Sequence, residues 1–383
     1  MKYDFDQVIE RRNTDSIKWG YYHEDVIPLW VADMDFRSAE PIIQALRRRV
    51  DHGVFGYSRS PQALRLAIQE RLQRLYRWGV KEEEILLLPG IVSALNIAIQ
   101  AYAGIGDAIL AQPPVYFHFL RDPVHHGRTL IDPPLARKGD SYEIDLEQFE
   151  KSITNRTRVF ILCNPHNPVG RVFSREELQR ISEICLRHQL IICSDEIHCD
   201  LVYSESCHIP IAALGPEVAE RTVTLMAPSK TFNVAGLECG FAIIRNRELR
   251  RRWQDTSYAI IPGVNIMGHV AALAALGEGQ EWLDQIMGYL QGNRDFLAGY
   301  LREQMPAIGM CRMEATYLAW LDCNSAGILG NPAEFFLKEA RVGLNNGPDF
   351  GKGGEGFVRL NFACPRKTLS GALDRMAAAM TRL

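Results

Sequence analysis

Short apolar runs alternate along most of the chain with longer segments that have a helical pattern of apolar and polar residues. Segments of the helical kind lie near residues 91–102, 174–188 and 265–277. Strands that alternate with helices in this way are typical of a parallel sheet covered on both faces. The pattern therefore predicts an α/β fold with a doubly wound, mostly parallel sheet, whose strands lie near residues 85–88, 108–111, 129–131, 158–163, 190–194, 222–226 and 241–245.

The pattern changes after residue 280, where a long helix near 281–304 is followed by strands near 317–321 and 356–362. A final helix places Leu369, Leu373 and Met376 on one face. These elements predict a second, smaller α+β unit. We expect three parts: residues 1–48 as an N-terminal arm and part of the small domain, 49–283 as the large domain, and 284–383 as the C-terminal small domain.

Three of the predicted strands end at or near residues whose side chains can take part in binding or catalysis. These residues are Asn167, Asp195 and Lys230. In an open parallel sheet, ligands bind at the carboxyl ends of the strands. Lys230 has no cationic residue within seven positions on either side. A lone amine at the end of a buried strand is desolvated, which lowers its pKa and lets it attack a carbonyl to form a Schiff base. The alternative interpretation is a solvated surface lysine.

Lysine, aspartate and asparagine at the same sheet edge suit pyridoxal 5'-phosphate. The lysine holds the cofactor, and the carboxylate of Asp195 keeps the pyridine nitrogen protonated. The amide of Asn167 can bind the phenolic oxygen of the ring, although an ordinary Asn-Pro turn is the alternative. We predict no metal site at Asp195, Glu196, His198 and Asp200, because their spacing fits no defined ligand set. Glu196 is expected to be structural.

The ordered set Asn167, Asp195, Ser229-Lys230 and Arg359 resembles the fold-type-I pyridoxal-phosphate enzymes of the class I/II aminotransferase superfamily. Finer stretches resemble its bacterial cystathionine β-lyase (C–S lyase) branch. They are Trp30–Phe36, Phe55–Tyr57, Asn164–Arg171, Ser194–His198, Ala227–Asn233 and Glu314–Leu318. The resemblance implies α,β-elimination of cystathionine, or of a related cysteine S-conjugate, to a thiol, pyruvate and ammonia. The sulfur substituent stays open, and two alternatives remain: an aminotransferase, and a regulatory binding protein on the same fold.

The resemblance also implies roles for residues around the substrate and the cofactor ring. Arg359 is expected to bind the substrate α-carboxylate, a task that suits a guanidinium group, with Asn167 beside it. His198 stands where class I aminotransferases have a tyrosine and is expected near the ring oxygen. Tyr116 is a candidate to stack on the ring and to take part in catalysis, although many tyrosines only pack.

The expected phosphate site departs from the superfamily, because Glu238 stands where an arginine is usual. We expect compensation from the helix start at Gly90, Ile91 and Val92, where backbone amides favour an anion, and from the Ser229 hydroxyl. Tyr57 resembles a tyrosine that reaches the phosphate and the substrate of the neighbouring subunit. The resemblance therefore implies a homodimer with shared active sites.

Composition excludes several other classes of partner. A formal charge of −3 over 383 residues gives no electrostatic case for nucleic acid or an anionic membrane. No apolar run approaches the ~18 residues of a membrane span, and the first residues lack the pattern of a signal peptide. The nine scattered cysteines contain no Cys-x-x-Cys pair, which favours free thiols in a reducing cytoplasm.

The stretch Gly351–Gly356 matches the dinucleotide-binding pattern G-x-G-x-x-G. That pattern must follow a strand and open a helix, whereas here a predicted strand follows it. We therefore reject the dinucleotide interpretation and expect a flexible glycine loop near the site.

Overall fold

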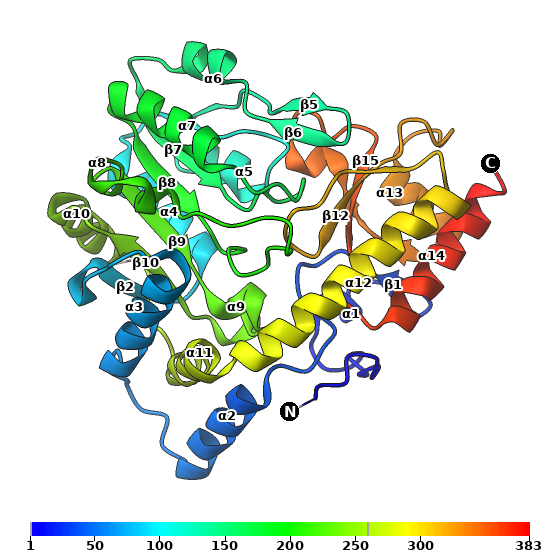
Figure 1. The fold of residues 1–383 in the computed structure, drawn as a ribbon, viewed down its shortest axis with the longest axis horizontal. Helices are drawn as coiled ribbons and strands as arrows, with labels where there is room; N and C mark the ends of the chain where they lie inside the picture. The colour runs from blue at the N-terminus through cyan, green and yellow to red at the C-terminus, as the bar shows by residue number, and fades with distance from the viewer. Residues whose placement is uncertain (1, 259) are drawn as a thin grey trace.

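The structure is a computed structural model that describes residues 2–258 and 260–383. Its larger sheet has seven strands in the order β2-β10-β9-β8-β7-β3-β4 (Figure 1). This arrangement confirms the predicted α/β fold with a mostly parallel sheet. The strands are β2 (Ile85–Leu88), β3 (Ala108–Leu110), β4 (Thr129–Ile131), β7 (Thr157–Cys163), β8 (Ile191–Asp195), β9 (Thr222–Met226) and β10 (Gly240–Ile244).

Strand β10 runs antiparallel to both of its neighbours, β2 and β9. The cause lies in the segment that joins β9 to β10, which holds only the four-residue helix α9 (Pro228–Thr231) and a short 3₁₀ turn, Ala235–Leu237. A parallel return needs a crossover long enough to carry the chain back across the sheet, usually an α-helix. The short connection instead keeps Lys230 at the carboxyl end of β9.

Alternate residues of the central strands face two different helical layers, as the two-residue period of a strand requires. On β7, Val159 and Ile161 pack with helix α4 (Ile91–Tyr102), whereas Phe160 and Leu162 pack with helix α7 (Arg175–Arg187). Helix α10 (Arg247–Ser257) joins the α4 side. Helices α3 (Gln62–Tyr76) and α11 (Ile266–Glu278) pack on Phe241 and Ile243 of β10. The sheet is therefore covered on both faces.

The smaller sheet is antiparallel, with four strands in the order β11-β12-β15-β14. They are β11 (Gly309–Met310), β12 (Leu318–Asp322), β14 (Asn345–Asn346) and β15 (Phe357–Asn361). Helices α12 (Gln280–Gln304) and α14 (Arg366–Met380) pack beside this sheet (Figure 1). The N-terminal segment joins the same part of the molecule, since β1 (Ile27–Pro28) pairs in parallel with β13 (Val342–Gly343).

The remaining elements are shorter or peripheral. Helix α2 packs against α11, and the hairpin β5–β6 lies at the edge of the larger unit (Figure 1). The bounds of these elements are α1 (Ile17–Gly20), α2 (Glu40–His52), α5 (His118–His125), α6 (Leu146–Ser152), α8 (Pro216–Ala219), α13 (Pro332–Phe335), β5 (Ala136–Lys138) and β6 (Ser141–Glu143). Within residues 2–258 and 260–383, no helix is both long and apolar enough to cross a membrane.

The glycine loop Gly351–Gly356 packs against the larger unit. A Cβ on Gly351 would lie 2.6 Å from the Leu120 side chain, and Gly351 has a φ of +88°. Phe350, just before the loop, accepts a hydrogen bond from the Val115 amide at 2.9 Å. Close packing against the larger unit explains Gly351, whereas Gly354 is crowded by Gly347 and Gly356 by Asn324. Strand β15, and no helix, follows the loop directly, so the dinucleotide interpretation fails.

Candidate active site

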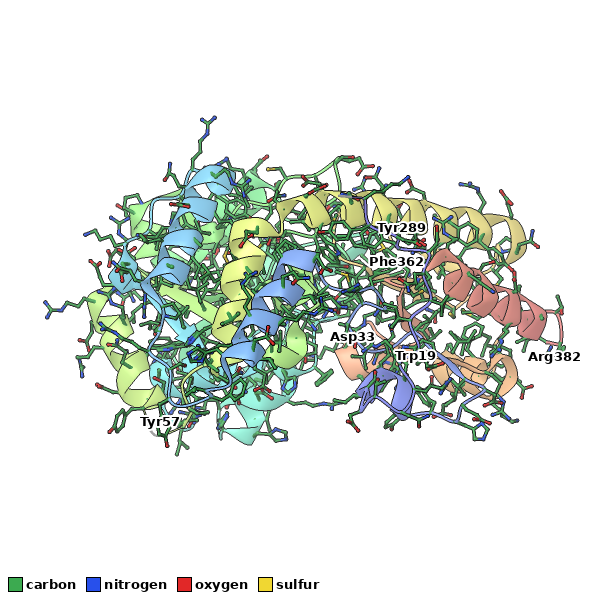
Figure 2. All side chains as sticks on the ribbon, turned by 90° about the horizontal axis from the view of Figure 1, so that it is seen from below. Trp19, Asp33, Tyr57, Tyr289, Phe362 and Arg382 are labelled. Carbon is green, nitrogen blue, oxygen red and sulfur yellow. The ribbon has the colours of Figure 1, made fainter. Side chains whose placement is uncertain are left out.

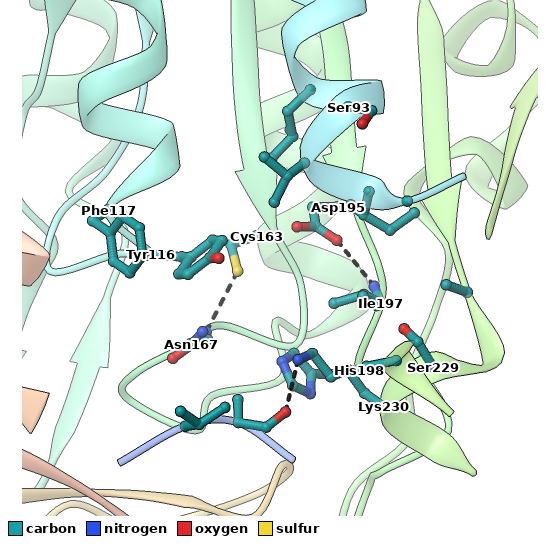
Figure 3. Close-up of a pocket in the computed structure, with 18 of the residues that line it drawn as sticks. Ser93, Tyr116, Phe117, Cys163, Asn167, Asp195, Ile197, His198, Ser229 and Lys230 are labelled. Carbon is teal, nitrogen blue, oxygen red and sulfur yellow. Dashed lines mark hydrogen bonds between the residues drawn. The ribbon is translucent and has the colours of Figure 1, made fainter. Parts of the chain in front are cut away.

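A cavity of about 440 Å³ lies at the carboxyl ends of β7, β8 and β9. Its volume falls in the range of sites that enclose small molecules. All the predicted site residues except Tyr57 line it, so segments far apart in the sequence meet here (Figure 3). These residues are Gly90, Ile91, Val92, Tyr116, Asn167, Asp195, His198, Ser229, Lys230 and Arg359.

Lys230 lies on α9, one turn beyond the end of β9. Its Nζ donates a hydrogen bond to the carbonyl oxygen of Ala32 at 2.7 Å, and the Tyr317 hydroxyl donates to the same oxygen at 3.0 Å. Burial, together with the positive charge of Arg359, lowers the pKa of Lys230 to about 8, against the opposing charges of Asp33 and Asp195. A substantial fraction of this amine is therefore neutral near physiological pH, which makes it a competent nucleophile.

Asp195 ends β8 and continues the series of residues that face α4. It accepts a hydrogen bond from the Ile197 amide at 3.1 Å. Burial raises the pKa of this carboxyl to about 7, and the neighbouring charge of Glu196 adds to the rise. The carboxylate is thus poorly compensated in the cofactor-free protein and is suited to a cationic partner in the cavity.

Glu196 points the opposite way and has its own partners. Its carboxylate accepts hydrogen bonds from Ser194 Oγ at 2.8 Å, from His208 Nε2 at 2.8 Å and from the Ile211 amide at 3.2 Å. Asp200 binds Arg71 at 2.7 Å instead of joining Asp195. The four residues considered above as metal ligands therefore do not share one set of contacts. Glu196 has the hydrogen-bond partners of a structural residue.

Arg359 lies on β15 with its guanidinium group buried in the cavity wall. Nη1 donates to Asn167 Oδ1 at 2.9 Å, and Nη2 donates to the Trp30 carbonyl at 3.0 Å and to Asn345 Oδ1 at 2.6 Å. The group also lies over the ring of Phe350, 4.9 Å from its centre. Burial lowers the pKa of Arg359 to about 10, so it still carries its charge at neutral pH.

His198 and Tyr116 add neutral groups to the cavity. Burial, together with the charges of Lys230 and Arg359, lowers the pKa of His198 to about 3, so the imidazole is uncharged. Its Nδ1 is buried and has no hydrogen-bond partner within the part of the chain that the structure describes. Burial raises the pKa of Tyr116 to about 12, so the phenol keeps its proton. Figure 3 shows the Tyr116 ring beside Phe117, across the cavity from Ser229 and Lys230.

The start of helix α4 forms another wall of the cavity. Gly90 is its N-cap and supplies no side-chain hydrogen bond, so the first backbone amides of the helix are left for a ligand. A Cβ on Gly90 would meet nothing within 4 Å. Ser229 also lines the cavity, as does Glu238, which is exposed.

The donor set fits pyridoxal phosphate. Four kinds of group face one cavity. In the part of the chain that the structure describes, they are a desolvated amine, a buried carboxylate without a cationic hydrogen-bond partner, a neutral imidazole with an unpaired ring nitrogen, and an uncapped helix start. These groups match an aldehyde, a pyridine nitrogen, a ring oxygen and a phosphate respectively. The residues are present for the whole cofactor except at Glu238, which offers the phosphate no hydrogen-bond donor.

Tyr57 lies outside the cavity of its own chain. Its side chain is fully exposed on the loop between α2 and α3, far from Asp33 of the cavity-side loop in Figure 2. The sequence patterns also missed two groups that the structure places in the wall. The Ala32 carbonyl is backbone and leaves no side-chain signature. Asn345 lies in a strand of only two residues, Asn345–Asn346, too short for a periodic signal.

Comparison with known proteins gives matches over nearly the whole chain. The family model for aminotransferase class I and II matches residues 24–376. The chain is 40% identical to cystathionine beta-lyase PatB of Bacillus subtilis (strain 168), over 99% of this chain and 100% of that enzyme. It is 35% identical to the cystathionine beta-lyase of Corynebacterium glutamicum, over 98% and 100%. The crystal structure of cystalysin from Treponema denticola, which contains pyridoxal 5'-phosphate, covers 100% of both chains with 31% identity and a TM-score of 0.96.

Proposed function

The chain belongs to the class I and II aminotransferase family, and from this premise we propose that it is a pyridoxal-phosphate-dependent carbon–sulfur β-lyase. The substrate is cystathionine or a related L-cysteine S-conjugate. The reaction breaks the Cα–H and Cβ–S bonds; the sulfur leaves as a thiol, homocysteine in the case of cystathionine. Addition of water to the remaining fragment gives pyruvate and ammonia. The full-length identity to cystathionine β-lyases, over a cavity with a fitting donor set, carries this proposal.

The cofactor would be held by residues from several elements. Lys230 would bind its aldehyde carbon, the Asp195 carboxylate would hold the proton on the ring nitrogen, and Asn167 with His198 would bind the ring oxygen. Tyr116 would pack against the ring. The first amides of α4, at Ile91 and Val92 after Gly90, would bind the phosphate together with Ser229. When bound, the cofactor supplies an electron sink for the pair of electrons left at Cα.

The remaining chemistry is done by side chains of this protein. Arg359 binds the α-carboxylate of the substrate, which orients the Cα–H bond in the cavity. The free amine of Lys230 would take the Cα proton, because its lowered pKa suits a general base near neutral pH. We assign cofactor binding to a large domain, residues 49–283, and Arg359 to a small domain formed by 284–383 with the arm 1–48.

We also propose that the enzyme is a homodimer in which Tyr57 completes the partner's site. The loop between α2 and α3 exposes Val54, Phe55 and Tyr57, and Figure 2 shows Tyr57 at the surface. Apolar side chains gathered on one exposed loop favour a covered interface. The Tyr57 hydroxyl would then donate to the phosphate of the neighbouring subunit, close to its substrate, and replace part of what the arginine missing at Glu238 would supply. A cytoplasmic setting is consistent with nine free cysteines, eight of which are not exposed.

A product assay across a substrate panel tests the proposal. The purified enzyme, loaded with cofactor, is given cystathionine, cysteine and S-alkyl cysteines, and both thiol and keto acid are measured. A β-lyase releases thiol and pyruvate in equal amounts with no added keto acid. An aminotransferase produces the keto acid of the intact substrate and needs an amino acceptor, so that result would contradict the proposal. Retained cofactor without turnover on any substrate would favour the regulatory binding protein.

A further inference from the structure

Among residues 2–258 and 260–383, the buried charge of Arg359 has only neutral hydrogen-bond partners. Its hydrogen bonds go to two side-chain amides and one backbone carbonyl. Its Nε is buried with no partner among residues 2–258 and 260–383, and the same residues offer it no carboxylate within ion-pair distance. A buried cation without a counter-ion is costly unless an anion arrives to pair with it. The cavity wall therefore carries a positive charge that no side chain of the described residues neutralises.

Asn345 makes the shortest of these contacts, at 2.6 Å between its Oδ1 and Arg359 Nη2. The two residues face each other directly across the β14–β15 ladder. Arginine can only donate hydrogen bonds, so the amide must present its oxygen to the guanidinium group. Its Nδ2 then remains for other partners, and no hydrogen bond from it is found within the described part of the chain. Asn345 also lines the cavity.

We propose that Asn345 is a positioning residue that fixes the guanidinium of Arg359 with a neutral acceptor and so reserves its charge for the substrate carboxylate. This inference rests on the proposed function. A carboxylate at position 345 would make the same hydrogen bond but would also neutralise Arg359 from within. Asparagine gives the orientation without the charge, and its free Nδ2 can donate to the arriving carboxylate as well. Position 345 thereby sets the selectivity of the site for amino acids over amines.

The test replaces the amide by its closest charged equivalent, Asn345→Asp. Two ligands that differ only in the α-carboxylate and carry no leaving group on Cβ, L-methionine and 3-(methylthio)propylamine, are titrated into the cofactor-loaded enzyme, and binding is followed by the change in its visible absorbance. A competing internal carboxylate removes at least one charge-assisted contact, so we expect amino-acid binding to weaken about ten- to hundredfold. Amine binding should stay within about twofold, because it never used Arg359.

The chain supplies a matched control one residue away. Asn346 faces the other side of β14, where its Oδ1 accepts from Asn331 Nδ2 at 3.0 Å, and it does not line the cavity. Asn346→Asp introduces the same charge in the same strand and should leave both ligands bound as in the wild type. Asn345→Ala serves as the second variant should the aspartate variant fold poorly. It removes the acceptor without adding charge, and we expect several-fold weaker binding of the amino acid alone.

Each outcome decides the matter. If Asn345→Asp weakens binding of the amino-acid ligand but not of the amine, and Asn346→Asp binds both ligands as the wild type does, the proposal is supported. Equal loss of both ligands, equal effects of the two aspartate variants, or unchanged binding in both Asn345 variants would overturn it. The binding assay needs no turnover. Should the wild type release no thiol from any substrate while the ligand pair still separates as expected, the lyase assignment fails and the role of Asn345 stands.

Discussion

Replacing Asp195 with asparagine should make the cofactor-free protein more stable while it damages the enzyme. The carboxyl of Asp195 is buried, and burial raises its pKa from 3.8 to about 7. Because the folded state binds this proton more tightly than the unfolded state, folding stability falls as the pH rises from about 4 through 7. Asparagine does not ionise, so the variant escapes this loss.

The size of the effect follows from the two pKa values. A rise from 3.8 to about 7 corresponds to about 4 kcal/mol above pH 7, at 1.36 kcal/mol for each pH unit. The pKa of about 7 already includes the opposing effect of the Lys230 charge, so about 4 kcal/mol is the full contribution of this carboxyl. For a chain of this length, that free energy corresponds to a rise in melting temperature of about 2–5 °C. Below pH 4 the two proteins should melt together.

The assay is thermal unfolding of the cofactor-free wild type and Asp195→Asn between pH 4 and 9. Asp200→Asn is a matched control with the opposite sign, because Asp200 pairs with Arg71 at 2.7 Å and its loss leaves a buried cation unpaired. The cofactor-loaded Asp195→Asn enzyme should lose most of its kcat, since the ring nitrogen no longer has an anionic partner. A variant less stable than the wild type at pH 8, or one with normal kcat, would refute this reasoning.

Three further predictions concern the lysine and the dimer. Since burial lowers the pKa of Lys230 to about 8, the rate at which cofactor-free protein captures pyridoxal phosphate should rise with pH and level off above about 8; a rate still rising at pH 10 would contradict this, as it would indicate an ordinary lysine. Borohydride reduction followed by peptide mapping should place the pyridoxyl group on Lys230, Lys230→Ala should abolish turnover, and a label on another lysine would reject the site. Tyr57→Phe should weaken cofactor retention by about 1.5–3 kcal/mol. Mixing it with Lys230→Ala chains should restore activity, whereas no recovery after proven subunit exchange would mean that Tyr57 acts within its own chain.

The sequence patterns predicted the large sheet and the reactive side chains at its edge. The strands of the large sheet are short apolar runs. Asp195 ends β8, and Asn167 and Lys230 follow within four residues of the ends of β7 and β9. Parallel strands bring such residues together at one edge, so the meeting of Asn167, Asp195 and Lys230 followed from topology alone. The direction of β10 did not follow, because strand periodicity carries no information about orientation. Only the shortness of the β9–β10 connection fixes it.

Other parts of the site left no trace in the sequence. The Ala32 carbonyl that accepts from Lys230 is backbone, and its position depends on the fold of the N-terminal segment. That segment is held by the buried Lys18, which binds Asp35 at 2.7 Å, and by Arg11, which binds Asp33 at 2.7 Å. These ion pairs join residues far apart in the chain, and no local pattern announces them. Tyr57 points away from its own cavity, so any role there depends on a second chain.

The charges in the cavity suggest why substrate binding and proton transfer belong together. The positive charge of Arg359 helps to lower the pKa of Lys230. A substrate carboxylate that pairs with Arg359 removes that influence, so the basicity of the Lys230 amine rises once the substrate is in place. The lowered pKa keeps part of the amine neutral when it binds the cofactor. Pairing of the substrate carboxylate with Arg359 then makes the neutral amine a stronger base when it takes the Cα proton. This change in the basicity of Lys230 requires a neutral residue at position 345. A carboxylate there would neutralise the charge of Arg359 both before and after the substrate binds.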